Sequence, residues 1–405
     1  MTTAMSRRRV ALIFLAFAVA YFFSALVRAV TATLAPTLTA ELMLTSGDLG
    51  LLSGAYFLGF SVLQLPMGQW LDRIGPRRVE VVFLIAAVLG CLAFAFAQSF
   101  HGLLAARLLC GAGFAACLMA PLTGYRRWYS PTLQLRANSW MLMTGSLGML
   151  AATLPVQWLM PLFGWRWLFV GLAGLILAAV ALIGWHVPAW TSPAQAPVPD
   201  GGYAEVWRHR YFRALVPLGF FSYGGMVAVQ TLWAGPWLTA VIGIEPQEAA
   251  AGLFMINLAM LLTFWSWGLL NPRLIARGWH ANRLMTWGMP GSLLALLGNV
   301  LLGADGGWWG LALFCMASSF VTLSQPAIGL AFAPQLAGRA LSAYNLVLFC
   351  GVFMVQWGVG LLVDMFRRGG ADQVAAFQWA FAALLLCQLA SYIWFLRMTT
   401  DNPAQ

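Results

Sequence analysis

Charged residues are scarce in this chain. They make up only 8% of its 405 residues, whereas hydrophobic residues make up 61% and the mean hydropathy is +0.80. Soluble domains carry about a quarter charged residues. The shortage of charge, spread over repeated apolar runs of about 20 residues, excludes an ordinary soluble domain and predicts an all-α polytopic membrane protein.

Several chemical signatures are missing as well. The chain has no lysine, so all 22 basic residues are arginine, and its four histidines show no metal-ligand or catalytic spacing. A phosphate-binding loop of the form G-x4-G-K-[ST] is absent, which excludes ATP hydrolysis as the driving force. The six cysteines fall inside apolar runs and predict neither disulfides nor a zinc site. We expect no enzyme activity, no metal and no cofactor.

Twelve apolar segments can be counted as transmembrane helices. The first follows three arginines and is too long for a signal peptide, so we interpret it as a retained span. The predicted spans are 10–36, 49–70, 79–98, 102–124, 137–160, 167–187, 214–236, 249–270, 284–303, 308–331, 340–363 and 376–396.

The arginines give the twelve spans an orientation. With a cytoplasmic N-terminus, seventeen of the 22 arginines fall in cytoplasmic segments, as the positive-inside rule requires. The net charge of +10 is thereby explained by membrane orientation, and no nucleic-acid partner is expected. We predict a monomer in the bacterial inner membrane, with the lipid bilayer around it and both termini in the cytoplasm.

The chain divides into two similar halves. Residues 1–187 would form an N-terminal six-helix bundle, 188–213 a cytoplasmic linker rich in Pro, Ala and Gly, and 214–405 a C-terminal six-helix bundle. The segment "GQWLDR" at 68–73 matches "GLLNPR" at 268–273, and Pro131 and Arg136 match Pro334 and Arg339 at an offset of 203. Two matches at nearly one offset indicate parallel repeats.

Three motifs carry a resemblance to a known family. The segment "GQWLDRIGPRR" at 68–78 resembles the loop motif between the second and third helices of the major facilitator superfamily. The segment "RLLCGAG" at 107–113 resembles its fourth-helix motif, and "GLLNPRLIARG" its weaker second loop copy. The resemblance covers essentially the whole chain and implies the two-bundle fold of that superfamily, closest in character to bacterial organic-anion and nitrate carriers.

The loop motif is interpreted as a conformational latch. Topology alone explains its arginines but not Gly68, Asp72 or Gly75. Gly68 could permit close helix contact, Gly75 a tight turn, and Asp72 could face a helix N-terminus or an arginine. The resemblance implies contacts that lock the two halves while the cytoplasmic side is closed. The predicted gating and coupling set is Gly68, Asp72, Arg73, Gly75, Arg77, Arg107, Arg136 and Arg339.

Arg28 is the principal candidate for substrate binding. An ionisable group inside a span is costly and indicates function. Tyr21, Ser24 and Thr31 share its helix face. A guanidinium suits a carboxylate, phosphate or nitrate, and the resemblance implies that an arginine in the first helix grips an anion. A structural arginine bonded to backbone carbonyls, or a gating role, stays an alternative. Arg107 could likewise serve packing or coupling.

The remaining polar groups suggest a cavity lined by both halves. Helices one, four, seven and ten line the cavity in the superfamily. The seventh offers Tyr223, Gln230 and Trp233, and the tenth groups Ser318, Thr322 and Gln325 before Pro326. The predicted substrate-binding set is Arg28, Tyr21, Ser24, Thr31, Tyr56, Gln230, Trp233, Ser318, Thr322, Gln325 and Asn345.

Acidic residues are predicted only at helix ends or in loops. Glu80 and Asp72 would lie at the cytoplasmic ends, and Glu41 and Asp364 near the outer mouth, where proton coupling is possible. The absence of a mid-span acid argues against a proton-driven exporter of cationic drugs.

These observations predict a secondary transporter. It would move a small organic anion or amphoteric metabolite by ion-coupled alternating access, with protons as the candidate coupling ion. Multidrug or metabolite efflux is the first alternative. Copper import is a second, with Cys110 and Cys117 on one face of the fourth helix as soft ligands, and Met119, Met255 and Met260 nearby.

Overall fold

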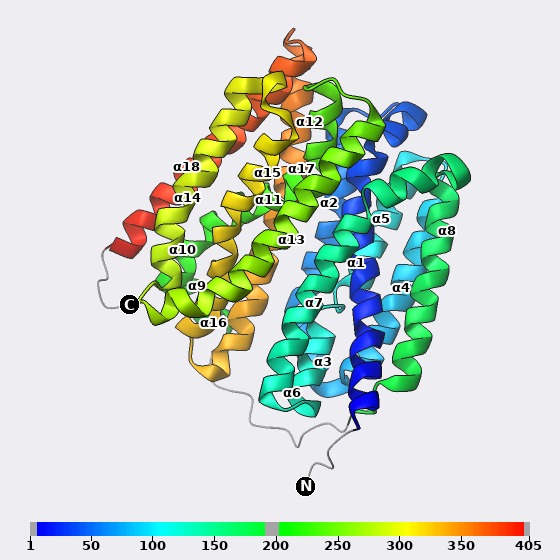
Figure 1. Cartoon of the computed structure of the whole chain (residues 1–405), viewed down its shortest axis with the longest axis vertical. Helices are drawn as coiled ribbons and strands as arrows, with labels where there is room; N and C mark the ends of the chain where they lie inside the picture. Colours follow the sequence, from blue (N-terminus) through cyan, green and yellow to red (C-terminus); the bar gives the residue numbers. More distant parts are fainter. Residues whose placement is uncertain (1–5, 191–201, 401–405) are drawn as a thin grey trace.

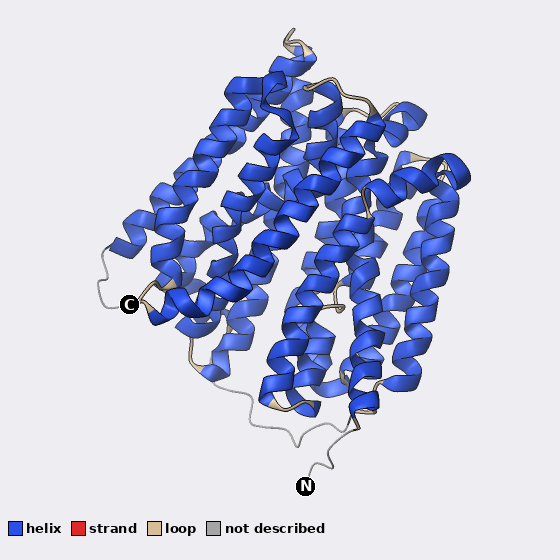
Figure 2. Cartoon of the chain, in the orientation of Figure 1, coloured by secondary structure: helices blue, strands red, loops and turns tan. Residues whose placement is uncertain are grey.

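The computed structural model describes residues 6–190 and 202–400. Within these two ranges the regular structure is entirely helical (Figure 2). Nine helical segments there are long and apolar enough to cross a membrane, and α2 with α3, bent by 47°, makes a tenth. One of the nine, Ala281–Ala331, turns back at Gly303–Gly306 and therefore makes two crossings. The helix α7 is not among the nine, and it makes a further crossing beside α1. The predicted twelve-helix architecture is confirmed.

The N-terminal half contains six crossings built from eight helices. The helices are α1 (Arg7–Leu42), α2 (Ser46–Val62), α3 (Gln64–Ile74), α4 (Pro76–Phe96), α5 (Phe100–Phe114), α6 (Met119–Trp128), α7 (Pro131–Ala151) and α8 (Leu154–His186). The second and fourth crossings are each made of two helices. The expected span 137–160 is wrong at its end, because α7 stops at Ala151 and the segment after it belongs to α8, which bends at Gly164 (φ 71°).

The C-terminal half follows a short helix, α9 (Tyr203–Arg208), that falls within the predicted linker. Residues 191–201 of that linker lie outside the described residues. The elements that cross the bundle are α10 (Arg210–Leu218), η1 (Gly219–Tyr223), α11 (Gly224–Ala228), η2 (Val229–Trp233), α12 (Ala234–Ala240), α13 (Pro246–Ala276), α14 (Ala281–Leu302), η3 (Gly303–Gly306), α15 (Gly307–Ser318), η4 (Ser319–Leu323), α16 (Ser324–Ala331), α17 (Pro334–Arg368) and α18 (Gln373–Thr400).

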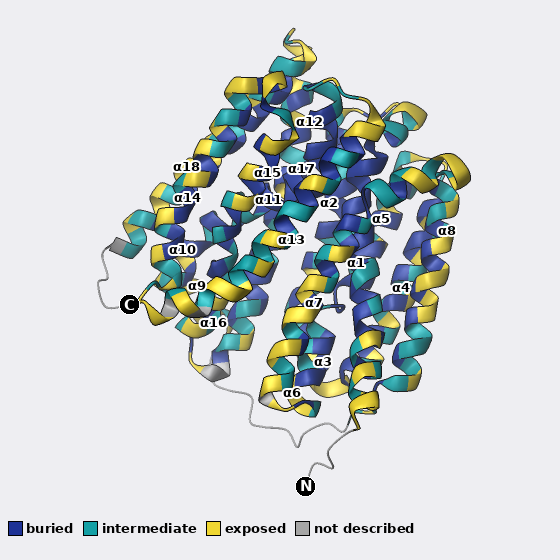
Figure 3. Cartoon of the chain, in the orientation of Figure 1, coloured by how far each residue is buried: buried dark blue, intermediate teal, exposed yellow. Residues whose placement is uncertain are grey.

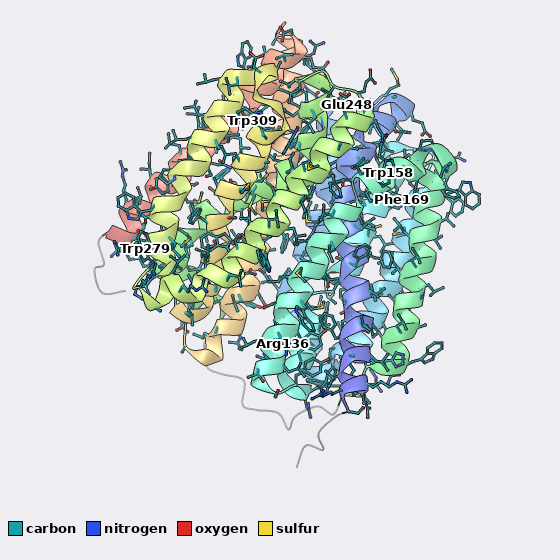
Figure 4. All side chains as sticks on the ribbon, viewed as in Figure 1. Arg136, Trp158, Phe169, Glu248, Trp279 and Trp309 are labelled. Carbon is teal, nitrogen blue, oxygen red and sulfur yellow. The ribbon has the colours of Figure 1, made fainter. Side chains whose placement is uncertain are left out.

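The two halves stand side by side and diverge toward one end (Figure 1). The end from which α1 starts and at which α18 ends is called the linker end, and the other the distal end. Arg136 lies toward the linker end and Glu248 toward the distal end (Figure 4). The repeat matches recur structurally, since α7 and α17 each begin with a proline, Pro131 and Pro334, whose fixed φ suits the first turn of a helix.

The outer surface of the bundle is apolar. Exposed residues face outward and buried residues lie between the helices (Figure 3). Tryptophans are prominent among the exposed side chains: Trp140, Trp158, Trp167, Trp185, Trp207, Trp265, Trp287, Trp308, Trp309, Trp379 and Trp394. Such a surface would be unstable in water but matches lipid, with amphipathic rings suited to the membrane interface.

Glycines bring the halves into backbone contact at the distal end. A Cβ on Gly360 of α17 would lie 2.2 Å from the Ser46 carbonyl oxygen of α2, and one on Gly50 would lie 2.4 Å from the Gln356 carbonyl oxygen. A Cβ on Gly235 of α12 would lie 2.4 Å from the Ala32 carbonyl oxygen of α1. Only glycine permits these approaches, so glycine at these positions allows the two halves to pack closely at the distal end.

A Gly360→Ala substitution should loosen the distal contact. The added methyl must displace the α2 backbone, and overpacking of this kind costs about 1–3 kcal/mol. We expect a lower midpoint of thermal unfolding in detergent. Gly358→Ala, two residues away on the same helix, is the matched control because a Cβ there meets no atom within 4 Å. Equal unfolding midpoints for the two variants would contradict the assigned contact.

Candidate functional site

Three of the crossings that approach the middle of the bundle are not regular α-helices. The fourth crossing breaks at residues 115–118 between α5 and α6. The seventh contains two π-helical segments, η1 and η2, and the tenth contains the 3₁₀ segment η4. Irregular backbone at membrane depth is tolerated where it is buried in protein or lines a water-filled cavity, and it commonly marks a functional site.

Arg28 lies near the middle of α1, beside these irregular segments. It is partly exposed, its Nη2 lies 3.9 Å from the Met149 sulfur, and it also interacts with the Tyr21 side chain. Its Nε has no hydrogen-bond partner among the described residues. The groups that act on it electrostatically are Tyr21, Tyr56 and Tyr223, none of which is a carboxylate. Arg28 therefore carries a positive charge that the described part of the protein does not neutralise.

An aromatic wall beside Arg28 spans both halves. The ring of Phe349 on α17 lies 4.5 Å from that of Phe60 on α2 and 6.2 Å from that of Tyr223 on η1. Phe60 in turn stacks with Tyr56 at 6.4 Å. This wall, comprising Tyr56, Phe60, Tyr223 and Phe349, gives the charged site flat apolar surfaces. Phe60 and Phe349 were not predicted, because ring-to-ring contact across the halves leaves no spacing signal in the sequence. Tyr223 was noted from the sequence only as a polar group of the seventh helix.

Arg107 differs from Arg28 in having partners. It is fully buried on α5, and it donates to the Val27 carbonyl oxygen at 2.9 Å and to Thr31 Oγ1 at 2.7 Å. Its guanidinium also lies 5.3 Å from the centroid of the Tyr56 ring. These contacts join α5 to α1. Thr31, predicted to face the substrate beside Arg28, is instead committed to Arg107.

Ser24 and Tyr56 also bond to each other. Their hydroxyl oxygens are 3.3 Å apart, and the Tyr56 hydroxyl lies 3.2 Å from the Ser24 carbonyl oxygen. Tyr21, on the same face of α1, packs under Gly145 of α7. The polar stripe predicted on α1 is therefore present, and its hydroxyls hold the N-terminal half together around Arg28.

The predicted substrate-binding residues of the C-terminal half do not form one cluster but make separate contacts. Gln325 Nε2 donates to Asn345 Oδ1 at 2.5 Å, which joins α16 to α17. Gln230 Nε2 donates to Asn257 Oδ1 at 3.0 Å. The Thr322 hydroxyl donates to its own turn, and the buried Ser318 hydroxyl has no partner among the described residues.

Trp233 belongs to the distal contact. It is buried, and its Nε1 donates to the Gln356 carbonyl oxygen at 3.1 Å, beside Gly50 of α2. Its ring packs against Phe377 at 6.0 Å. The structure thus places this predicted substrate-binding residue in the packing that joins α2, η2 and α17.

The loop motif at the linker end is only partly as predicted. Gly75 has a φ of 87°, which confirms the tight turn, and Trp190 packs directly over it. A Cβ on Gly68 would meet nothing within 4 Å, so the close helix contact expected there is not present in this conformation. Asp72 is exposed, and its backbone oxygen accepts a hydrogen bond from Trp190 Nε1 at 3.0 Å.

The arginines of the loop motif, and the repeat-related Arg136 and Arg339, make different contacts. Arg77 donates to the Gly184 carbonyl oxygen of α8, and Arg73 is exposed in the last turn of α3. The Arg136 guanidinium lies 5.2 Å from the Trp140 ring centroid. Arg339 lies near Tyr203, whose hydroxyl donates to the Leu65 carbonyl oxygen. Burial raises the pKa of Tyr203, while Arg339 acts in the opposite direction.

Two acids at the distal end have hydrogen-bond or ion-pair partners. The Asp364 carboxylate of α17 accepts hydrogen bonds from the backbone nitrogens of Ser46 at 3.0 Å and Gly47 at 2.7 Å, the first residues of α2. Glu41 forms an ion pair with Arg166 and accepts from Trp165 Nε1 at 2.7 Å. Asp364 therefore supplements the Thr45–Asp48 capping box of α2 from the opposite half. Sequence reasoning weighed Asp364 only for proton coupling.

The proposed copper ligands are not arranged as expected. The i,i+7 relation of Cys110 and Cys117 assumed one continuous helix, but the break at 115–118 separates them. Cys110 Sγ instead lies 3.9 Å from Cys91 Sγ on α4. No group of three or more His, Cys, Asp or Glu side chains suited to a metal occurs in the described ranges. The expected alignment of Cys110 and Cys117 is therefore not present, and these observations give no support to copper import.

Comparison with known proteins settles the family. A family model for the major facilitator superfamily matches residues 17–356. The chain belongs to the major facilitator superfamily. The resemblance carried by the loop and fourth-helix motifs is confirmed.

Several curated relatives match part of the chain. A hexuronate transporter of Escherichia coli K12 is 29% identical over 165 residues, covering 40% of this chain and 38% of its own. A gallate transporter of Pseudomonas putida is 29% identical over 161 residues (40% and 36%). A 4-hydroxybenzoate transporter of Pseudomonas aeruginosa is 31% identical over 163 residues (40% and 36%). The matched segments thus cover under two-fifths of each of these relatives.

Solved structures match over nearly the whole chain. A bacterial homologue of the human lysosomal transporter Spinster, in an inward-facing and unoccupied conformation, superposes with a TM-score of 0.78 at 17% identity over 99% of this chain and 100% of that one. A D-xylose–proton symporter gives a TM-score of 0.76 at 13% identity over 97% and 98%. At such identities the likeness establishes the fold.

The two intramembrane arginines should respond oppositely to neutralisation. Arg107→Gln removes two charge-assisted hydrogen bonds and leaves α1 acceptors buried, which should lower the free energy of unfolding by about 3 kcal/mol. Arg28→Gln removes a charge that has no counterion and should leave the thermal unfolding midpoint unchanged or raised. Both are measured by thermal unfolding in detergent. A larger loss in Arg28→Gln than in Arg107→Gln would contradict these roles.

Proposed function

We propose that this protein is a secondary transporter of small organic carboxylates, with aromatic acids as the favoured class. The observation that carries the proposal is the uncompensated charge of Arg28, set between the halves and beside aromatic rings from both. A single guanidinium without a carboxylate partner attracts a monoanion and binds its two oxygens bidentately. The wall of Tyr56, Phe60, Tyr223 and Phe349 offers stacking surface for the body of the ligand.

The relatives support this class of substrate. Hexuronate, gallate and 4-hydroxybenzoate are carboxylates, and two of the three carry an aromatic ring. A carboxylate that contacts Arg28 from α1 and Phe349 from α17 would touch both halves at once. Binding at such a position can favour one arrangement of the halves over another, which alternating access requires.

We infer that this conformation is open toward the cytoplasm, because the halves are in contact at the distal end and diverge at the linker end (Figure 1). The arginine distribution supports a cytoplasmic linker end, and hence both termini inside the bacterial inner membrane. At the distal end the halves are in backbone contact and Asp364 caps α2. At the linker end Asp72 is exposed. We infer that Asp72 engages the N-terminus of α17 when the cytoplasmic side closes, as a monomeric rocking mechanism would require.

Ligand-induced stabilisation tests the substrate class. The purified protein would be screened by thermal shift against 4-hydroxybenzoate, gallate, galacturonate, glucose, an organic cation and copper. We expect shifts with the carboxylates, larger for the aromatic ones, and affinity at least tenfold weaker in Arg28→Gln because a charge-assisted bond contributes about 1.5–3 kcal/mol. Arg28→Lys, which keeps the charge but not the bidentate geometry, should fall between. Equal binding by wild type and Arg28→Gln would refute the assignment.

The two acids should bias the conformation in opposite directions. Asp364→Asn weakens the capping of α2 by about 1 kcal/mol and should increase the population in which the halves separate at the distal end. Asp72→Asn should decrease the population in which the halves meet at the linker end. Distances between spin labels on the two halves, measured at each end, report both shifts. Carboxylate affinity should change little in either variant. A large loss of affinity with unchanged distance distributions would contradict the latch roles.

A further inference from the structure

A buried acid in the N-terminal half has no role in the site described above. Glu80 lies on α4 and its relative exposure is 0%. Neither of its carboxyl oxygens has a hydrogen-bond partner among the described residues. The sequence predicted Glu80 at the cytoplasmic end of its span, and it lies in the second turn of α4. The structure adds that its side chain is buried inside the bundle.

No cation among the described residues acts on Glu80. The groups that face it are the Cys117 thiol, from the break between α5 and α6, and the Tyr125 ring of α6, whose hydroxyl also has no partner in the described chain. Arg77, on the same helix, is turned to the Gly184 carbonyl oxygen of α8. Cys117 and Tyr125 are thus the titratable groups of the described chain that act on the acid, and both are neutral when protonated.

A carboxylate in this position would be strongly unfavourable. Burying an ionised carboxyl without a charge or hydrogen-bond partner costs far more than burying the neutral acid. Glu80 is the fifth residue of α4, beyond the first turn in which the helix dipole best stabilises an anion. The acid is therefore held in its protonated form in this conformation, where it retains a proton that an exposed glutamate would release.

Polar side chains lead from Glu80 toward the ligand site. The Cys117 thiol faces both the Glu80 carboxyl and the Ser24 hydroxyl. Ser24 Oγ lies 3.3 Å from the Tyr56 hydroxyl, and Tyr56 interacts electrostatically with Arg28. Ser24 and Arg28 are one turn apart on α1. Tyr56, Ser24 and Cys117 therefore lie between an anion at Arg28 and the buried acid.

We propose that Glu80 is a proton-binding site whose occupancy is coupled to anion binding at Arg28. On protonation, one carboxyl oxygen of Glu80 binds a proton taken from bulk water. On deprotonation, that proton returns to water, and no other bond changes. Coupling of this kind would let a proton gradient drive accumulation of the anion. The coupling rests on the proposed transport of carboxylates, whereas proton binding at Glu80 does not.

Proton binding is tested first on the protein without substrate. Carbodiimide labelling of the wild type, mapped by peptide mass spectrometry, should modify Glu80 at neutral pH, because the reagent attacks protonated carboxyls in apolar surroundings. The thermal unfolding midpoint of the wild type should also fall from mildly acidic to mildly alkaline pH, as the buried carboxyl is forced to ionise. Glu80→Gln should remove that slope.

A matched substitution controls for general effects of pH. Glu41→Gln removes a distal carboxyl that is already paired with Arg166 and Trp165, so it should leave the alkaline slope unchanged. Parallel wild-type and Glu80→Gln profiles, together with an unlabelled Glu80, would overturn the proton site. If Glu80→Gln fails to fold, the labelling result on the wild type decides the question alone.

Coupling is tested in proteoliposomes with radiolabelled 4-hydroxybenzoate. Glu80→Gln should keep exchange of internal for external substrate but lose accumulation driven by an inward proton gradient, by at least tenfold. Unchanged accumulation in Glu80→Gln would overturn the coupling. Failure of the wild type to bind or exchange any carboxylate would overturn the proposed function and the coupling with it, while the labelling and pH profiles would still decide whether Glu80 binds a proton.

Discussion

The close contact of α2 with α17 is the constraint on which the rest of the structure depends. Glycines at Gly50 and Gly360 allow the two backbones to meet, and the Asp364 carboxylate caps the first turn of α2 from the other half. These interactions hold the halves together at the distal end and let them diverge toward the linker end (Figure 1). The position of Arg28 relative to Phe349 and Tyr223 follows from that arrangement.

The helix pair also carries two acids in reciprocal positions. Asp72 lies near the end of α3, which continues α2, and Asp364 lies near the end of α17. Asp364 faces the N-terminus of α2 in this conformation, and we propose that Asp72 faces the N-terminus of α17 when the linker end is closed. A carboxylate gains its stabilisation from a helix dipole only over the first turn, so such a contact is either fully made or lost. This gives two discrete arrangements rather than a continuum.

Charge inside the bundle is handled in three different ways. Arg107 is buried and bonded to α1, so its charge serves packing. Arg28 is partly exposed and has no carboxylate nearby, so its charge is available to an anion. Glu80 is buried, and its carboxyl oxygens have no hydrogen-bond partner among the described residues, which is why we propose it as a proton-binding site. Because solvation inside a membrane protein is poor, the partners of each group, and not its chemical type, determine what it can do.

The sequence by itself determined the membrane class, the twelve helices, the repeat and the family, because apolar length and arginine placement are local properties. It also singled out Arg28, since a charge within an apolar run is visible without coordinates. Only the tertiary structure decided that Thr31 serves Arg107, that Trp233 packs in the distal contact, that Gly68 is open and that Glu80 is buried. These outcomes depend on which helix faces which, and contacts between residues far apart in the sequence leave no trace in periodicity or spacing.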